Sequence, residues 1–239
     1  MRVIRYAIAL LAAATSVAEA SSLRVSPILL DVSAPGASTM LTLHNDGAER
    51  VNVQIRVFRW TGTKGDPILE PTDSVVVSPP AAALAAGTDY VVRVVRVSKQ
   101  PVVDEESYRI LVDEIPEAGR GQASSVRFAL RYSIPVFFAA ANAEPAKIKW
   151  SIQEKGVSAV LTATNAGGRR VRIANLKLTD GLGEVVLKQP GLVGYALGRS
   201  ATGWTLPVSL PAARRGPVRL LADSETGVID AAVVVQPAR

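Results

Sequence analysis

The chain has 239 residues, 48% hydrophobic but only 5% aromatic, so a core rich in valine, leucine and alanine is expected, which favours many short strands. The net charge of +6 is mild and no Lys/Arg run is long enough for a nucleic-acid footprint, which excludes nucleic acid as the expected partner. The absence of cysteine excludes disulfides and cysteine-based metal sites.

Residues 1–20 are predicted to be a secretory signal peptide. Two arginines precede a short apolar segment at 7–15, and Ala-Glu-Ala at 18–20 has the small-x-small pattern of a cleavage site. The apolar segment is too short to span a bilayer as a permanent helix, and no later segment is long enough. We therefore expect a soluble mature protein outside the cytoplasm, with no stable membrane insertion after signal cleavage.

After the signal peptide, the first half of the chain reads as short strands separated by turns. Alternation is clear in VNVQIRVFRW, where Val51, Val53, Ile55 and Val57 share one face. Pro27 interrupts the first segment, which favours an edge strand or a switch between sheets. This spacing of strands and turns predicts a β-sandwich. The expected strands lie within 22–33, 38–45, 51–60, 68–80, 88–97, 104–116 and 126–138.

The segment ANAEPA at 141–146 breaks this pattern and is interpreted as a domain boundary. The second half then returns to short strands. We predict an N-terminal domain over 21–140 and a C-terminal domain over 141–239. The expected strands of the second half are 147–153, 158–165, 171–180, 183–188 and 222–236.

The two halves share a local pattern around an Asn-x-Gly turn. The stretch NDGAERVNV starting at Asn45 matches NAGGRRVRI starting at Asn165, and alternating segments flank both. Because Asn-x-Gly tolerates left-handed backbone conformations, each stretch is predicted to be a hairpin corner. The recurrence favours an internal duplication, hence two similar sandwiches in tandem.

The most regular alternation lies at 126–133, after the segment DEESYRILVDEIP and a Gly/Ser-containing linker. The apolar side chains Val126, Phe128, Leu130 and Tyr132 alternate with polar or small ones, as in a strand with one apolar face. A long loop ahead of an edge strand is an unusual way to complete a self-contained sandwich. We interpret this strand as the working part of the protein.

An enzyme is not expected, because no complete constellation for nucleophilic, metal or phosphate chemistry is present. The single histidine, His44, is read as a surface residue near a strand end. The acidic residues at 104–106 and 113–114 are read either as solvated strand ends or, for Glu105 or Glu106, as part of an interdomain ion pair. No catalytic residue, metal site or cofactor is predicted.

The segment EESYRILVDEIP at 105–116 and the long strand after it resemble the PapD-like periplasmic chaperones of the chaperone–usher pilus pathway. RYSIPVF at 131–137 resembles the non-classical, archaic branch of that family. The resemblance implies an all-β chain of two tandem immunoglobulin-like β-sandwich domains in an L-shaped arrangement, located in the periplasm. It also implies binding of pilus subunits (pilins) by donor-strand complementation and their delivery to an outer-membrane usher. Val126, Phe128, Leu130 and Tyr132 would then form the donor strand.

The chain departs from the family at the site that anchors the terminal carboxylate of the subunit. Leu29 and Pro135 occupy the two positions where the classical branch has basic residues. The candidate carboxylate anchors in this sequence are therefore Arg93, Arg109 and Arg131, because a planar guanidinium can bind a carboxylate bidentately.

Two questions stay open at this stage. The alternative function is an immunoglobulin-like structural or adhesive surface protein. Self-association of the free protein is also open, because an unoccupied donor strand could pair between copies.

Overall fold

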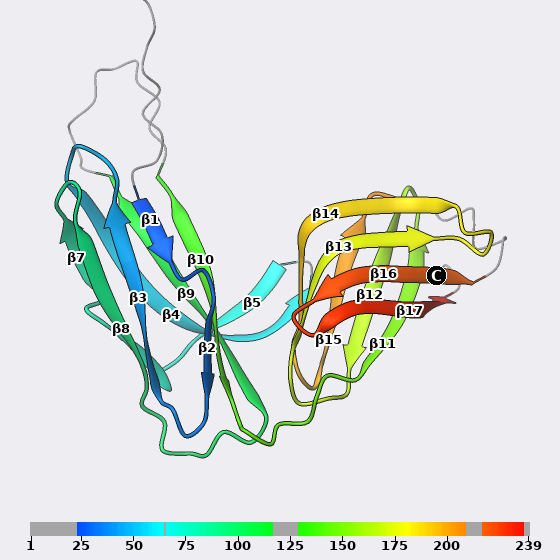
Figure 1. The fold of residues 1–239 in the computed structure, drawn as a ribbon, viewed down its shortest axis with the longest axis horizontal. Coiled ribbons are helices and arrows are strands. Elements are labelled where there is room, and N and C mark those ends of the chain that lie inside the picture. Colours follow the sequence, from blue (N-terminus) through cyan, green and yellow to red (C-terminus); the bar gives the residue numbers. More distant parts are fainter. Residues whose placement is uncertain (1–22, 65, 117–128, 209–216, 237–239) are drawn as a thin grey trace, which may run out of the picture.

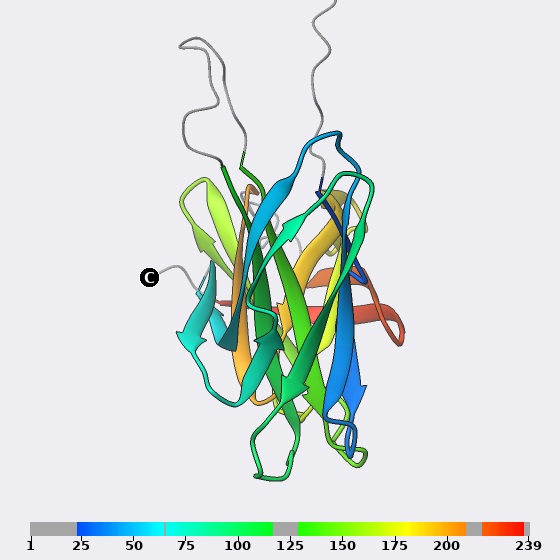
Figure 2. The ribbon, with the colours of Figure 1, turned by 90° about the vertical axis from the view of Figure 1, so that its left-hand side faces the viewer.

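The computed structural model describes residues 23–64, 66–116, 129–208 and 217–236, and every regular element in these ranges is a β-strand. The predicted signal peptide lies outside them. Within the described ranges, no helix has the length and apolar character needed to cross a bilayer. Two lobes of strands form the two arms of an L (Figure 1), and Figure 2 views the N-terminal lobe from its outer side. The predicted all-β fold of two tandem immunoglobulin-like sandwiches in an L-shaped arrangement is confirmed.

The N-terminal lobe is a sandwich of two sheets. One sheet has the order β1-β3-β8-β6, and the facing layer contains β4, β9, β10 and β2, with β5 and β7 paired to β4. Alternation works as predicted in β4, where Val51, Val53 and Ile55 are buried. The strands are β1 (Leu23–Ser26), β2 (Leu30–Ser33), β3 (Ser38–Asn45), β4 (Val51–Lys64), β5 (Asp66–Pro71), β6 (Val75–Ser78), β7 (Ala81–Leu84), β8 (Asp89–Arg96), β9 (Glu105–Ile115) and β10 (Arg131–Ala139).

The chain changes sheets at Pro27, as its sequence predicts. Before this proline, β1 pairs antiparallel with β3, and after it β2 pairs parallel with β10 in the other layer. A proline cannot donate a backbone hydrogen bond to a ladder, so it suits the point where pairing with one sheet ends. The switch leaves β1 and β2 as two short half-strands on different sheets.

The second lobe is also a sandwich, with β11, β12 and β15 in one layer and β14, β13, β16 and β17 in the other. One strand of this lobe was missed from the sequence, and one strand prediction is wrong. β15 was not predicted, because its apolar residues do not alternate, and 222–236 is a hairpin of two strands that turns between Ser224 and Gly227. The strands are β11 (Ile148–Lys155), β12 (Ser158–Asn165), β13 (Val171–Thr179), β14 (Val185–Ala196), β15 (Ser200–Leu206), β16 (Val218–Ser224) and β17 (Gly227–Gln236).

The internal repeat is confirmed, but the predicted hairpins at Asn45 and Asn165 are wrong. β3 and β4 belong to different sheets, and β12 and β13 likewise have different strand neighbours. At each of these positions the chain crosses from one sheet to the other, and the buried asparagine side chain holds the crossing by hydrogen bonds to carbonyls of another segment. Asn45 donates to the carbonyls of Leu84 and Ala85. Because of these long-range hydrogen bonds, the Asn-x-Gly stretches connect two different sheets and do not join neighbouring strands of one sheet.

Each lobe has its own hydrophobic core. One cluster of buried residues runs from Leu23 to Phe138 and a second from Trp150 to Val233. Between the lobes, β4 extends until Thr63 and Lys64 pair parallel with Thr202 and Gly203 of β15. The division into domains over 21–140 and 141–239 stays a prediction.

Candidate functional site

The edge of β10 changes character along its length. β10 pairs antiparallel with β9 over all nine of its residues, from Arg131 opposite Asp113 to Ala139 opposite Glu105. On its other side β2 begins to pair only at Val136. Within the described residues, Arg131–Pro135 therefore has no strand partner on that side. A backbone edge of this kind is a template for a further strand.

The faces of β10 can be assigned from the alternation of its side chains. Ile134 and Val136 are buried in the N-terminal core, and Tyr132 packs partly buried against the same core. Leu130 lies just before the strand on the same face and is half-buried. The apolar face that the sequence predicts as donor surface thus merges with the core face of the protein's own sandwich.

The structure describes two of the four predicted donor residues. Val126 and Phe128 lie outside the described residues. Tyr132 is engaged within the chain, because its hydroxyl donates to the carbonyl of Leu23 in β1. Leu130 is the remaining described member, and its carbonyl accepts a hydrogen bond from the backbone of Glu114.

β1 forms a second free edge beside β10. It pairs with β3 on one side, and among the described strands it has no partner on the other. Figure 1 shows β1 and β10 along the same border of the N-terminal sandwich, and the bond from Tyr132 to Leu23 joins them. A partner strand that approaches this border meets two unpaired backbones.

Arg109 lies at the inner corner between the two lobes. Its β9 position is opposite Pro135, and its guanidinium stacks 4.0 Å above the ring of Trp60. One terminal nitrogen donates to the carbonyl of Ser133 at 3.3 Å, while the buried Nε has no partner among the described residues. Burial lowers the pKa of Arg109. The group is thus a cation held against an aromatic wall with hydrogen-bonding capacity left over.

The wall around Arg109 is built by both lobes. Trp60 and Phe137 come from the first, Tyr195 and Leu197 from the second, and Leu29 packs against this cluster. The Trp60 and Tyr195 rings meet edge to face at 5.8 Å. Arg109 therefore stands beside Pro135 and Leu29, the two positions from which the classical basic residues are missing.

The other two candidate anchors lie elsewhere. Arg131 is at the far end of β10, largely exposed, and paired with Asp113. At about 3.3 Å per residue, its position along β10 is about 13 Å from Pro135. Arg93 lies exposed on β8, in the other sheet, opposite Met40. The structure does not bring the three arginines together, and only Arg109 lies at the interlobe corner.

A buried ion pair crosses the interlobe boundary. Arg170 bonds Glu105 through its backbone nitrogen at 3.0 Å and its guanidinium at 2.5 Å, and it also reaches Asp31 at 2.6 Å. The guanidinium lies 3.6 Å above the ring of Phe137. Burial raises the pKa of Glu105, and Arg170 counteracts that rise. Of the two carboxylates considered for an ion pair between the domains, Glu105 forms one across the lobes, whereas Glu106 pairs with Arg96 inside the first lobe.

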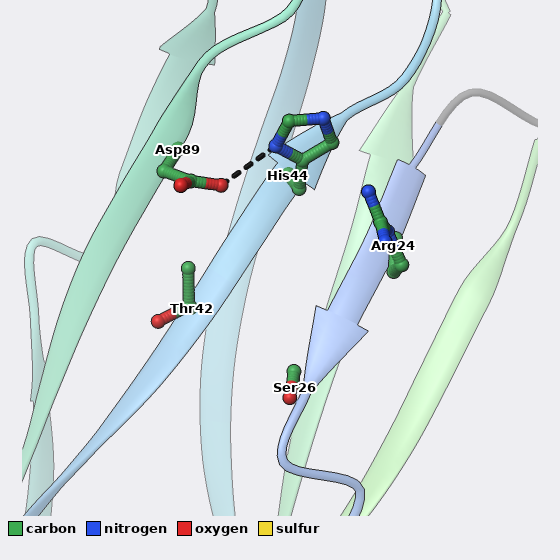
Figure 3. Close-up of a pocket in the computed structure, with 5 residues that line it drawn as sticks. All are labelled: Arg24, Ser26, Thr42, His44 and Asp89. Carbon is green, nitrogen blue, oxygen red and sulfur yellow. Dashed lines mark hydrogen bonds and ion pairs between the residues drawn. The ribbon is translucent and has the colours of Figure 1, made fainter.

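His44 lies near the end of β3, as predicted. Its Nδ1 is 2.6 Å from Asp89 and its Nε2 is 3.3 Å from Asp46. Figure 3 shows it on a shallow pocket lined by Arg24, Ser26, Thr42, His44 and Asp89. No group of three metal-ligating side chains occurs among the residues that the structure describes. This polar cluster joins β1, β3 and β8.

Sequence reasoning missed the aromatic members of the interlobe corner. Trp60 had a local signal, because it ends the alternating run VNVQIRVFRW where solvent exposure would be costly. Tyr195 had none, since its ring contacts Trp60 and Phe137, which lie 135 and 58 positions earlier in the chain.

Solved structures of similar fold include chains of chaperone–subunit complexes and free chaperones. A chain of the CsuC–CsuE chaperone–tip adhesion subunit pre-assembly complex, from archaic chaperone–usher Csu pili of Acinetobacter baumannii, has a TM-score of 0.69 at 24% identity, covering 90% of this chain and 99% of that chain. The E. coli chaperone DraB gives 0.57 at 20% identity, covering 88% and 98%. A chain of the Salmonella enterica complex of SafA pilin with the SafB chaperone gives 0.61 at 15%, covering 90% and 97%. At these identities the likeness concerns the fold.

The comparison with curated proteins gives no match. The family model described as "Pili and flagellar-assembly chaperone, PapD N-terminal domain" matches residues 22–144, which is just over half of the chain. That range contains β1, the interrupted first strand, the free edge of β10 and Arg109. The resemblance read from 105–116 is confirmed: the chain belongs to the pili and flagellar-assembly chaperone family.

Proposed function

We propose that this protein is a periplasmic chaperone that binds pilus subunits by donor-strand complementation and delivers them to an outer-membrane usher. The observation that carries the proposal is the unpaired edge of β10 over Arg131–Pro135, which adjoins the unpaired edge of β1. Two adjacent free edges leave room for a partner whose own sheet lacks a strand.

The lent strand would supply both affinity and fit. Backbone hydrogen bonds along β10 give affinity that is independent of sequence, and apolar side chains on one face fill the open groove of the subunit. Val126, Phe128 and Leu130 are the proposed inserted residues, each worth roughly 1.5–3 kcal/mol when fully buried. Tyr132 contributes less in this proposal, because its ring and hydroxyl already contact its own domain.

Arg109 is the proposed anchor for the terminal carboxylate of the subunit. Its buried Nε lacks a partner, and the aromatic wall of Trp60 keeps water away from one face of the guanidinium. A carboxylate arriving at the interlobe corner would therefore complete the hydrogen bonding of a cation that burial disfavours. Arg131 is less suited because Asp113 already neutralises it, and Arg93 because it faces away on the other sheet.

The remaining parts of the proposal concern location and branch. Residues 1–20 would be cleaved as a signal peptide, leaving a mature periplasmic protein with domains over 21–140 and 141–239. We assign the chain to the archaic-like branch, supported by RYSIPVF at 131–137. Family membership and the free edge of β10 favour this function over a structural or adhesive surface module.

The test of the donor strand is capture of a subunit. The chain is co-expressed with small secreted proteins encoded beside its gene, and any one-to-one complex is isolated. Phe128→Glu and Leu130→Glu should abolish capture while the free chain stays folded, as judged by circular dichroism. The matched control is Val157→Glu, at a position that is 90% exposed in the second lobe. Undiminished capture by both donor variants would place the donor strand elsewhere.

The anchor is tested separately by comparing Arg109→Ala, Arg131→Ala and Arg93→Ala in the same assay. Hydrogen bonds to charged groups contribute about 1.5–3 kcal/mol, so Arg109→Ala should weaken capture by at least about tenfold. The other two should bind normally. Normal capture by Arg109→Ala would show that the subunit carboxylate is held by another group.

A further inference from the structure

The two corners of the internal repeat are built by the same hydrogen bonds. Asn45 accepts from the backbone nitrogen of Gly47 at 3.0 Å and donates to the carbonyl of Glu49 at 2.7 Å. Asn165 accepts from Gly167 at 2.9 Å and donates to Arg169 at 2.7 Å. The corners 45–50 and 165–170 are therefore two copies of one element, in which Arg50 corresponds to Arg170.

The second copy is a docking element with its partner in place. The backbone nitrogens of Gly168 and Arg169 donate to the carbonyl of Glu144, at 3.0 and 2.9 Å. The next residue, Arg170, grips the carboxylate of Glu105 with its backbone N–H and its guanidinium together. Successive N–H groups plus one cation thus bind a carbonyl of the connection between the lobes and a carboxylate of the first lobe.

The first copy presents the same groups to solvent. Ala48 and Arg50 are exposed, and neither makes a hydrogen bond or ion pair with any other residue that the structure describes. The carboxylate of Asp46, which could compete for Arg50, is instead bound by Arg24 at 2.7 and 3.1 Å. The corner 45–50 is the unoccupied counterpart of an element that binds a carboxylate in the second lobe.

Its position indicates which partner it meets. Asn52, just after the corner, pairs with Ile115, the last residue of β9. Figures 1 and 2 show the β3–β4 corner at the end of the first lobe that points away from the second lobe, where β9 ends and β10 begins. The start of β10, which belongs to the proposed donor strand, therefore lies at the same end of the lobe as this corner.

We propose that the corner 45–50 binds an acidic side chain of the bound subunit. The backbone N–H and the guanidinium of Arg50 would donate hydrogen bonds to its carboxylate, as those of Arg170 do to Glu105. The identity of the partner rests on the proposed function, whereas the carboxylate site itself does not. Glu49 stands where the second copy has Arg169, and Arg50 is exposed whereas the Arg170 side chain is 8% exposed. The grip of this corner is accordingly weaker and more sensitive to salt.

The first test needs no subunit. The intact ¹⁵N-labelled chain is titrated with the capped peptide Ala-Glu-Ala and, as control, with capped Ala-Gln-Ala. The Glu peptide should shift the amide signals of Ala48 and Arg50, and the shifts should vanish in Arg50→Gln. If both peptides leave these amides unchanged, or shift them equally, the corner is not a carboxylate site and the proposal is overturned.

The second test identifies the partner. Arg50→Glu should weaken subunit capture at least about tenfold at low salt, as expected for loss of a charged hydrogen bond followed by repulsion. Glu49→Arg should strengthen it, and the exposed control Lys188→Glu in the second lobe should not change it. Unchanged capture by Arg50→Glu overturns the proposal, as does an effect confined to self-association of the free chain. If capture survives Leu130→Glu, the proposed donor strand is refuted. The peptide titration still tests the carboxylate site in that case, because it uses no subunit.

Discussion

Replacing Arg170 by methionine should destabilise the protein strongly at neutral pH and much less in acid. The Arg170 side chain is 8% exposed and that of its partner Glu105 is fully buried, so the substitution leaves a carboxylate without water or cation. Breaking a buried pair in this way typically costs 3–5 kcal/mol. Glu105 can escape part of this cost by taking up a proton.

Protonation of Glu105 limits the loss of stability in Arg170→Met and makes that loss depend on pH. Protonating an ordinary glutamate, with a pKa of about 4.3, costs about 3.7 kcal/mol at pH 7 and about 1 kcal/mol at pH 5. Burial already raises the pKa of Glu105 in the folded protein, and loss of Arg170 raises it further. A carboxyl with a raised folded pKa favours the folded state at low pH and loses that contribution as pH rises through the raised value. The deficit of the variant should therefore shrink as the pH falls from 7 to 5.

The measurement is urea unfolding followed by circular dichroism at pH 7 and pH 5. We expect a loss of about 3–4 kcal/mol at pH 7 and about 1 kcal/mol at pH 5. The control is the double variant Glu105→Leu with Arg170→Met, which removes both charges and should cost much less than Arg170→Met alone. Asp31 then stays in partial contact with water, since its side chain is 45% exposed. A deficit below about 1 kcal/mol at pH 7, or one that does not change with pH, would refute the reasoning.

Three further predictions concern the stability of the folded chain. Asn45→Ala and Asn165→Ala should each lower the free energy of unfolding by about 2–4 kcal/mol, because each leaves several buried carbonyls without a donor. Urea unfolding measures this loss. Thr88→Ala removes an exposed hydrogen bond to the carbonyl of Ala85 and should cost less. Leu41→Ala should cost about 2–5 kcal/mol by the same assay, since Leu41 is fully buried, and a smaller loss would mean that the core collapses into the cavity. For Glu106, burial acts to raise the pKa but the hydrogen bonds from Arg96 and Tyr108 outweigh it and lower the pKa. The ionised Glu106 carboxylate thus stabilises the fold above the ordinary pKa of glutamate, and this stabilisation is lost as the pH falls through the lowered pKa of the folded state. The loss in free energy of unfolding caused by Glu106→Gln should therefore be largest at pH 7 and shrink below pH 4.

Local patterns predicted a large part of this fold. Alternation at Val51, Val53 and Ile55 gave the buried face of β4, and Pro27 gave the change of sheet, because both depend on residues close together in the chain. The Asn-x-Gly stretches revealed the internal repeat. Their interpretation as hairpins failed, since the asparagine side chains bond carbonyls 31 to 40 residues away.

The candidate site depended on contacts that local patterns cannot show. The three arginines looked alike in sequence, each on a strand of alternating residues. Only the pairing register puts Arg109 opposite Pro135, and only the interlobe packing brings Tyr195 and Trp60 around it. Tyr132 likewise was predicted to face a partner, whereas the approach of β1 gives its hydroxyl an acceptor within the chain.

By itself, the sequence determined the all-β class, the tandem repeat and the strand with the longest apolar alternation, because side-chain periodicity and turn chemistry act over a few neighbouring residues. The tertiary structure decided which edge of β10 is free, which arginine stands at the interlobe corner and which copy of the asparagine corner is occupied. These features arise where segments far apart in the chain meet, and their geometry is fixed by strand register and by the packing of one lobe against the other.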